Sequence, residues 1–466
     1  MSFKYFAQKV TDNHYILPKT ANMKVHADVF ASEKFYDLSD EATWEQIANA
    51  CSYEGVTAVY IEPDFHLGYG VPIGCVIVTD GTLIQSCAGY DINCGVMEIK
   101  VPGLSAIDVQ SKEIRRKFIN EVELRIATGI GSGRTKLMPK FSNKEAEEIL
   151  HYGAKSIGVK SNLCERHFIP IPGDLQLDKI DKAYSKVTDQ LGSMGSGNHM
   201  CELQCDKTDG SVWVMLHSGS RGYGWNIANY FFHESAKLRG IPDNQRENSW
   251  LHIDEPLGKE YWAYHNSAAN YAIANRFIMA RGIQEAVYEV FGVDTEVFYD
   301  ISHNLIQEET LVLPDGSTKK GLVHRKGATR AFPEHHPELY NTIWYESGHP
   351  ILVPGSMMAG AAIMFPKEGA YKSGCSVNHG SGRVLARNQA KRTLDQDLVD
   401  EEMETIVRHF MGVPIEGILS NHRKIPLDEC AYVYKELDDV LAVLESENMA
   451  QVEHRLYPVA NIKGVD

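Results

Sequence analysis

Residues 88–96, AGYDINCGV, place the carboxylate of Asp91 three residues before the thiol of Cys94. Gly89 and Gly95 flank the pair, and glycine gives the backbone room to turn both side chains toward one point. A carboxylate is a hard metal ligand and a thiolate is a soft one. The segment therefore predicts a metal site.

Four histidines further along the chain lie in short segments of small and polar residues. They are His199 in GSGNHM, His217 in LHSGSRG, His303 in DISHN and His379 in NHGSGR. A single histidine is weak evidence in a chain that has 19 of them. Small neighbours add no core volume, however, and such loops are typical of ligand-binding sites. We expect the four histidines to converge on the Asp91 and Cys94 loop.

Asp91, Cys94, His199, His217 and His303 offer more donors than one tetrahedral ion needs. A thiolate shared by two ions would use all of them, and pairs of metal ions suit phosphoryl transfer. Donor softness alone favours zinc or cobalt over manganese. A closed structural zinc site is the alternative, but the surplus of donors and the glycine-rich setting argue against it.

Glycine-rich loops are plentiful, yet none has the G-x-x-x-x-G-K-S/T pattern of a P-loop NTPase. Backbone amides in GSGNH and HGSGR could still bind phosphate. Residues 207–210, KTDG, match the lysine motif of familiar nucleotidyltransferases. Asp-Gly is also an ordinary hairpin turn, so we expect Lys207 to lie in a turn between two strands.

Composition indicates a globular protein: 43% of the 466 residues are hydrophobic and 23% are charged. No apolar stretch is long enough to span a bilayer, and the start, MSFKYFAQKV, lacks the apolar block of a signal peptide. The nine cysteines include no C-x-x-C pair, which is typical of reduced thiols. We expect a cytoplasmic protein.

The formal net charge of −16 argues against nonspecific wrapping of nucleic acid, so any nucleic-acid partner would be held locally. Two basic clusters are candidates for such a contact. The alternative, slightly favoured on composition, is that they are solvated faces. The clusters are HRKGATR, with Arg325, Lys326 and Arg330, and GRVLARNQAKR, with Arg383, Arg387, Lys391 and Arg392.

Hydrophobic patterning predicts strands in the N-terminal third, with a hairpin turn at Asp80 and Gly81. Paired strands are expected around a turn at Asp209 and Gly210, and a last strand over residues 457–463. Helices are expected over residues 105–127, 144–152, 179–191, 223–238, 259–291, 386–409 and 427–444. The chain has no repeat and no linker-like segment, which favours an α+β fold in one domain, residues 1–466.

Nine motifs occur in the order seen in the RtcB family of RNA ligases, which the chain resembles over residues 23–464. An ordered set is far more specific than any one of its members. The motifs are EPDFHLGYGVPIG, AGYDINCGV, LGSMGSGNHMCELQ, LHSGSRG, SHN, RKGATRAF, VPGSM, HGSGR and the terminal IKG.

The resemblance implies a GTP- and manganese-dependent ligase with its active site in a central cleft. Such an enzyme joins RNA that ends in a 3′-phosphate or 2′,3′-cyclic phosphate to RNA with a 5′-hydroxyl, in RNA splicing or repair. It implies that Asp91, Cys94 and His199 hold one Mn²⁺ ion, that Cys94, His217 and His303 hold the other, and that His379 accepts GMP.

The same resemblance implies a set of nucleotide-binding residues and makes the basic residues Arg325, Lys326, Arg330 and Arg383 candidate RNA or phosphate contacts. The nucleotide-binding residues are Asn198, His199, Met200, Cys201, Glu202, His303, Asn304, Pro354, Gly355, Ser356, Met357, His379, Gly380, Ser381, Gly382 and Lys463.

Some positions depart from the family pattern. After VPGSM the usual Gly-Thr-Ala-Ser is replaced by Met358, Ala359, Gly360 and Ala361, which removes a serine expected to contact guanine. Losing one such hydrogen bond costs on the order of 1 kcal/mol. Met97, Ser381 and Ala386 also stand where the family commonly has arginine, alanine and serine.

Two alternatives to a ligase stay open at the level of the sequence. One is a metal-dependent phosphoesterase that acts on RNA 2′,3′-cyclic phosphate ends. The other is a divergent, non-catalytic paralogue that binds RNA. The presence of every inferred metal ligand and of His379 argues against the second alternative.

Overall fold

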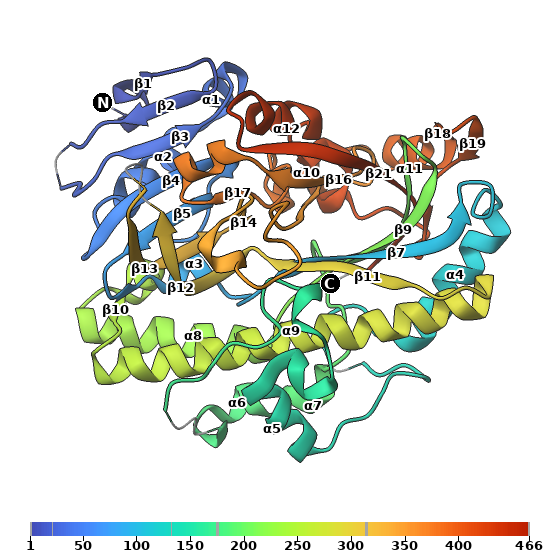
Figure 1. Ribbon diagram of the computed structural model, residues 1–466, viewed down its shortest axis with the longest axis horizontal. Helices are drawn as coiled ribbons and strands as arrows, with labels where there is room; N and C mark the ends of the chain where they lie inside the picture. Colours follow the sequence, from blue (N-terminus) through green and yellow to red (C-terminus); the bar gives the residue numbers. More distant parts are fainter. Residues whose placement is uncertain (1, 21, 132, 174–176, 313–315, 465–466) are drawn as a thin grey trace.

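The computed structural model describes residues 2–20, 22–131, 133–173, 177–312 and 316–464 (Figure 1). In this part of the chain two large sheets and a set of helices form an α+β fold, which confirms the predicted class. Beta-branched residues dominate the central strands, such as IGCVIVT in β5 (Ile73–Thr79), and their side chains are buried.

The first sheet has seven strands within the described residues, and all neighbours are antiparallel except β3 and β4. In spatial order the strands are β1 (Gln8–Lys9), β2 (His14–Leu17), β3 (Ala27–Phe30), β4 (Val56–His66), β5, β13 (Thr318–Lys326) and β12 (Asn304–Val312).

The second sheet has eight strands in the same part of the chain, and β20 (Leu419–Ser420) pairs in parallel with β21. In spatial order the other strands are β11 (Glu296–Ser302), β7 (Gly95–Ser105), β9 (Ser211–Ser218), β8 (Met200–Asp206), β21 (Ala450–Lys463), β16 (Ala361–Pro366) and β15 (Ile351–Pro354).

The register of the second sheet gathers the predicted metal ligands at one end. Gly95 pairs with Ser302 of β11 and with Ser218 of β9, and His217 pairs with Met200 of β8. The loop with Asp91 and Cys94, called the thiol loop below, therefore enters β7 beside the last residues of β9 and β11 and the first residue of β8.

The helical pattern predicted for residues 259–291 left two helices or one open, and the structure has one continuous helix, α9 (Pro256–Phe291), with most of its central residues buried. It lies beside α8 (Arg221–Arg239) and packs on β7 and β9, as Figure 1 shows below the second sheet. None of the helices in the described residues is long and apolar enough to cross a membrane.

The remaining helices and short strands surround the two sheets. The helices are α1 (Glu33–Leu38), α2 (Glu41–Ala50), α3 (Gln85–Ala88), α4 (Lys112–Arg125), α5 (Asn143–Tyr152), α6 (Asp181–Tyr184), α7 (Val187–Gln190), α10 (Arg387–Thr393), α11 (Gln396–Thr405) and α12 (Leu437–Ser446). The short strands are β6 (Thr82–Leu83), β10 (Leu251–His252), β14 (Ala328–Arg330), β17 (Ser376–Asn378), β18 (Val407–Phe410) and β19 (Val413–Glu416).

The hairpin predicted at Asp80 and Gly81 is wrong. The chain does turn there, but β6 pairs with β10 rather than with β5, and α3 follows at once. Gly81 has a φ of 80°, which favours glycine, and a Cβ there would also lie 2.6 Å from Nε2 of His252 on β10. The second predicted hairpin is confirmed, because β8 and β9 pair around Asp209 and Gly210.

Several predicted helices are too long because caps interrupt them. The helix expected over residues 105–127 begins after Ser111, whose hydroxyl accepts a hydrogen bond from the Glu113 amide. Asp395 caps α11 and divides the helix expected over residues 386–409, whose last residues form β18. The segment 179–191 is divided into short helical turns, and the segment 427–444 into two short turns followed by α12, whereas the last strand is longer than expected.

A buried guanidinium on α9 joins the segments that end at the thiol loop. Arg276 Nε and Nη2 donate to the two carboxylate oxygens of Asp300 on β11, at 2.6 and 2.9 Å. Its Nη1 donates to the carbonyls of Asn93 and Ser218, at 2.7 and 3.2 Å, and its Nη2 donates to Oδ1 of Asn93, at 2.9 Å. One side chain therefore fixes the thiol loop to the ends of β9 and β11.

Replacing this arginine should destabilise the protein strongly. We expect Arg276→Met to lower the free energy of unfolding by about 3–5 kcal/mol, because it leaves the buried Asp300 carboxylate without its ion-pair partner. Urea denaturation followed by circular dichroism measures the change. The control is Arg281→Met on the same helix, at an exposed position. Equal stability of the two variants would contradict the structural role of Arg276.

Candidate active site

The thiol loop brings Asp91 and Cys94 against two histidines. Cys94 Sγ lies 3.2 Å from His217 Nε2 and 3.4 Å from His199 Nε2. His199 Nε2 also lies 2.9 Å from Asp91 Oδ2. Donors that share a tetrahedral ion at about 2.1–2.3 Å lie roughly 3.5 Å apart. The spacing of these atoms is that of ligands around an ion.

His303 completes the set of predicted ligands, because its Nε2 lies 3.3 Å from His217 Nε2. The structure thus brings together all five side chains that the sequence singled out, from the segments just before β7 and β8, from β9, and from the residue between β11 and β12. Cys94, His199 and His217 form the tightest group among the described residues. Their role as metal ligands remains a prediction.

Hydrogen bonds fix the orientation of His199 and of Asp91. His199 Nδ1 donates to the Met194 carbonyl at 2.8 Å, so its Nε2 carries the lone pair that faces the thiol and the carboxylate. Asp91 Oδ1 accepts from the amide and the hydroxyl of Ser220, at 2.8 and 3.1 Å, immediately before α8.

The donor set of this site fits a cation. Burial raises the pKa of the Cys94 thiol well above its usual value. Burial and the neighbouring imidazoles lower the pKa of His217 and of His303, so both rings are neutral at pH 7. Two neutral imidazole nitrogens, a sulfur and a carboxylate therefore face one another. A bound cation satisfies all of these lone pairs at once.

The fourth converging histidine, His379, follows β17 and lies beside the cluster, with 4.4 Å between its ring centroid and that of His303. Its Nδ1 lies 2.7 Å from the Gly327 carbonyl and 3.0 Å from Asp64 Oδ2. Both partners are acceptors, so Nδ1 carries the proton and Nε2 has the free lone pair. His379 is thereby oriented as a nucleophile or base.

Asp64 is a site residue that the sequence reasoning missed, although it lies in the quoted motif EPDFHLGYGVPIG. Its side chain is fully buried on β4, and the ammonium of Lys435 donates to the carbonyls on either side of it, those of Pro63 and Phe65. An acidic residue inside a strand gave no signal of its own. Its proximity to His379, 315 residues later, is visible only in the fold.

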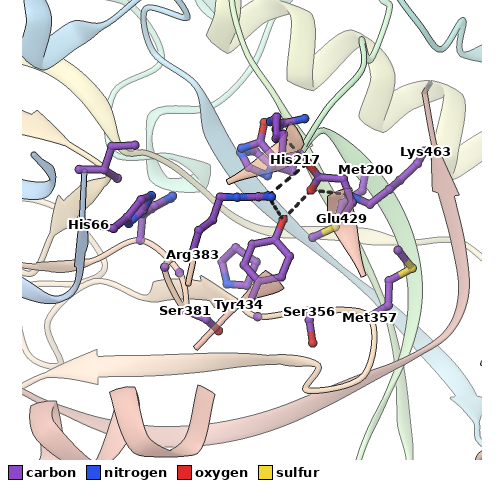
Figure 2. A pocket seen from close by; sticks show the side chains of 18 residues that line it. His66, Met200, His217, Ser356, Met357, Ser381, Arg383, Glu429, Tyr434 and Lys463 are labelled. Atoms are coloured by element: carbon purple, nitrogen blue, oxygen red, sulfur yellow. Dashed lines mark hydrogen bonds and ion pairs between the residues drawn. The ribbon is translucent and has the colours of Figure 1, made fainter. Parts of the chain in front are cut away.

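A cavity of about 240 Å³ adjoins His379 (Figure 2). Most of the predicted nucleotide-binding residues line it. Those residues are Asn198, Met200, Pro354, Gly355, Ser356, Met357, His379, Gly380, Ser381, Gly382 and Lys463.

Other predicted nucleotide-binding residues lie outside the cavity lining. Cys201 belongs to the hydrophobic core, and the Glu202 carboxylate accepts hydrogen bonds from Gln204 and Asn461 at 2.8 and 2.6 Å. Asn304 Oδ1 accepts from the Gly327 amide at 3.0 Å. His199 and His303 belong to the cluster of predicted metal ligands. Ala361, part of the segment that departs from the family pattern after VPGSM, is also buried in a core cluster and does not line the cavity.

Figure 2 shows a chain of polar contacts across this cavity that centres on Glu429. Its carboxylate accepts a 2.5 Å hydrogen bond from the Tyr434 hydroxyl and pairs with Lys463 at 3.3 Å and with Arg387 at 2.8 Å. Burial opposes ionisation of Glu429, but the charges of Lys463 and Arg387 outweigh it and lower the pKa of this carboxyl. Glu429 and Tyr434 were not predicted, since they fall in a segment expected to be helical.

The predicted role of the first basic cluster is wrong. Arg325 forms a bidentate ion pair with Glu309, at 2.7 and 2.8 Å, and Arg330 binds the same carboxylate at 2.7 Å. Lys326 donates to the Tyr69 carbonyl at 2.7 Å. All three side chains are buried, so they are neither a solvated face nor a surface for RNA. In the second cluster, Arg383 and Arg387 do line the cavity.

Comparison with known proteins gives matches to one family over most of the chain. The family model described as tRNA-splicing ligase RtcB matches residues 46–464. A protein of Archaeoglobus fulgidus named tRNA-splicing ligase RtcB is 33% identical over 508 residues, with all of both chains covered. Its counterpart in Thermococcus kodakarensis is 31% identical over 95% of each chain. The RNA-splicing ligase RtcB of Mycobacterium bovis is 30% identical over 90% of this chain and all of its own.

The close packing of Gly219 against Asp91 allows a test of the predicted metal site. A Cβ on Gly219 would lie 2.3 Å from both carboxylate oxygens of Asp91, so Gly219→Ala should displace this ligand. We expect the affinity for divalent metal ions to fall by about 10- to 100-fold. Isothermal titration with MnCl₂ measures the affinity.

The matched control is Gly133→Ala, because a Cβ on Gly133 meets no atom within 4 Å. Unchanged metal affinity in Gly219→Ala would show that Asp91 is not a ligand.

Proposed function

The chain belongs to the RtcB family of RNA ligases, and we propose that it joins RNA 3′-phosphate or 2′,3′-cyclic phosphate ends to 5′-hydroxyl ends with GTP and Mn²⁺. The observation that carries this proposal is the placement of His379. Its Nε2 lone pair is free, and its ring lies between a five-ligand cluster and a cavity lined by Lys463, Arg383 and Arg387.

The residues present fit two Mn²⁺ ions that share the Cys94 sulfur. Asp91 and His199 would hold one ion with this sulfur, and His217 and His303 would hold the other. Bound ions neutralise charge on phosphate groups and on the leaving group. Donor softness does not select manganese here, so that choice rests on the family resemblance.

The first step that we propose is transfer of GMP to His379. Nε2 attacks the α-phosphorus of GTP, so that an N–P bond forms and the bond to the pyrophosphate oxygen breaks. The cationic groups on the cavity wall, above all Lys463 and Arg383, are placed to balance nucleotide charge. The proton on Nδ1 stays between Asp64 and the Gly327 carbonyl, which offsets the positive charge that develops on the ring.

The second step transfers GMP to RNA. An oxygen of the RNA 3′-phosphate attacks the same phosphorus, the N–P bond breaks, and a phosphoanhydride forms. The 5′-hydroxyl of the other RNA then attacks the 3′-phosphorus and GMP leaves, which completes a phosphodiester. A cyclic end has to be opened to the 3′-phosphate beforehand.

We also propose that the chain works as one domain, because the site takes residues from both large sheets: Asp64 from the first and His217 from the second. The nine cysteines are all free and buried, which suits a reducing compartment such as the cytoplasm.

Formation of the covalent adduct gives the first test. With α-labelled GTP and MnCl₂, the wild-type protein should form an acid-labile, alkali-stable protein–GMP adduct, which denaturing electrophoresis detects. His379→Ala should form none, because the attacking nitrogen is absent, yet it should bind Mn²⁺ as the wild type does. The control is Lys207→Ala, since Lys207 lies in the turn between β8 and β9.

Loss of the adduct in Lys207→Ala would show that the nucleophile is assigned wrongly. A synthetic 3′-phosphate and 5′-hydroxyl RNA pair, incubated with each nucleoside triphosphate in turn, tests ligation and guanine preference. Opening of cyclic ends without adduct or ligation in the wild type would instead support the phosphoesterase alternative.

Asp64 gives a separate test of the proposed orientation of His379. Asp64→Asn should slow adduct formation by about 10- to 100-fold, because an amide can present its N–H to His379 Nδ1 and no longer balances charge on the ring. Single-turnover rates measured across pH 6–9 check this. The control is Asp108→Asn, an exposed carboxylate in the turn before α4. Equal rates for both variants would exclude a positioning role for Asp64.

A further inference from the structure

An exposed tryptophan lies beside the loop that carries Asp91. Trp225 belongs to the second turn of α8, and 50% of its surface is exposed. Its indole stacks on the ring of Tyr90, with 5.8 Å between centroids and 25° between planes. Tyr90 directly precedes Asp91, so this aromatic pair lies at the edge of the predicted metal site.

Tyr90 is held rigidly as the inner ring of the pair. Its hydroxyl donates to Glu247 at 2.7 Å and accepts from Arg246 at 3.4 Å, and its ring also packs on Phe232. The indole of Trp225 therefore rests on a fixed surface and is half exposed to solvent. An ordered aromatic ring in this position costs little entropy when a planar ligand stacks on it.

The start of α8 carries a cation. Arg221 is the first residue of the helix and lies one turn before Trp225. Arg221 Nε and Nη2 donate to Ser193 and Gly129, at 3.2 and 3.1 Å, and this fixes the guanidinium beside His199. Arg221 has a φ of 55°, which is uncommon for a residue other than glycine and often marks a functional site.

A second exposed aromatic side chain lies on an adjoining loop. Tyr69, with 68% of its surface exposed, lies between His66 and Ile73, which both line the cavity. Its carbonyl accepts from Lys326, and a Cβ on the next residue, Gly70, would lie 2.3 Å from the Glu247 carbonyl. The loop of Tyr69 thus packs on the residue that binds Tyr90.

We propose that Trp225, backed by Tyr90, is a stacking platform for the unpaired base next to the reacting phosphate of the RNA. This inference rests on the proposed function, since it assigns a binding site to the same substrate. Aromatic faces beside fixed cations are how proteins bind single-stranded nucleic acid without reading its sequence. The ring flanks the predicted metal site, where a terminal phosphate would lie, and the Arg221 guanidinium is held beside His199 of the same site.

The surroundings of Trp225 favour a single base over a protein partner. Among the first three turns of α8, Trp225 is the exposed apolar residue, and its solvent-facing neighbours Asn226 and Asn229 are polar and half-buried. A stable protein interface buries about 800 Å² on each partner and has an apolar centre. One indole ring matches the size of one base.

Direct RNA binding tests this proposal without turnover. We would measure, by fluorescence anisotropy with MnCl₂ and no GTP, the Kd of a single-stranded RNA with a 3′-phosphate, and of the same RNA with an abasic terminal nucleotide. Trp225→Ala should weaken binding of the normal RNA by about 5- to 100-fold and leave binding of the abasic RNA unchanged. Trp225→Phe, which keeps an aromatic face, should bind within a few fold of the wild type.

The matched control is Tyr288→Ala, because Tyr288 is an equally exposed aromatic residue on α9. Equal Kd values for Trp225→Ala and Tyr288→Ala would overturn the proposal and leave a protein partner as the use of this ring. An equal loss on normal and abasic RNA would also overturn it, since no base would then be stacked. Failure of the wild type to form the GMP adduct, with the selective loss in Trp225→Ala retained, would reject the ligase mechanism and keep the platform.

Discussion

The buried ion pair between Arg276 and Asp300 is the constraint on which the geometry of the site depends. A guanidinium taken out of water requires hydrogen-bond partners for its N–H groups, and here those partners are Asp300 and the carbonyls of Asn93 and Ser218. The requirement can be met only when the thiol loop, β9 and β11 end at the same place. Burial of this one charge therefore requires segments that are up to about 200 residues apart in the sequence to meet at one place.

Close packing around that point explains the glycines of the site better than backbone freedom does. Gly95 and Gly219 flank the predicted ligands, and a Cβ on them would lie 2.8 Å from Arg276 Cζ and 2.3 Å from the Asp91 carboxylate. Neither has a positive φ, so lack of space requires glycine there. Gly89 is different, because it has a φ of 65° with open space around it, as the sequence interpretation supposed.

Much of the site could be predicted from the sequence because its ligands are rare residue types in distinctive loops. Cys94 differs from the other cysteines by its glycines and by Asp91, and the predicted convergence of the four histidines is confirmed. The charged residues, in contrast, could not be assigned to a role from the sequence. Arg325 and Arg330 look like a surface cluster until β12 pairs with β13, which places Glu309 against both. Asp64 and Glu429 were not predicted for the same reason, because the role of a buried carboxylate depends on partners that are distant in the sequence.

His379 lies between two different surfaces, and this position relates the fold to the proposed function. On one side lies the cavity with Glu429, Lys463 and Arg383, where two cations exceed one carboxylate, which suits an anionic nucleotide. On the other side lie His303 and the rest of the cluster, and beyond Asp91 the aromatic edge formed by Tyr90 and Trp225. Because His379 adjoins both, a group carried on its Nε2, as proposed, would be within reach of the cavity and of the cluster. A site that passes a group between two anionic substrates needs this separation, since both cannot occupy one pocket.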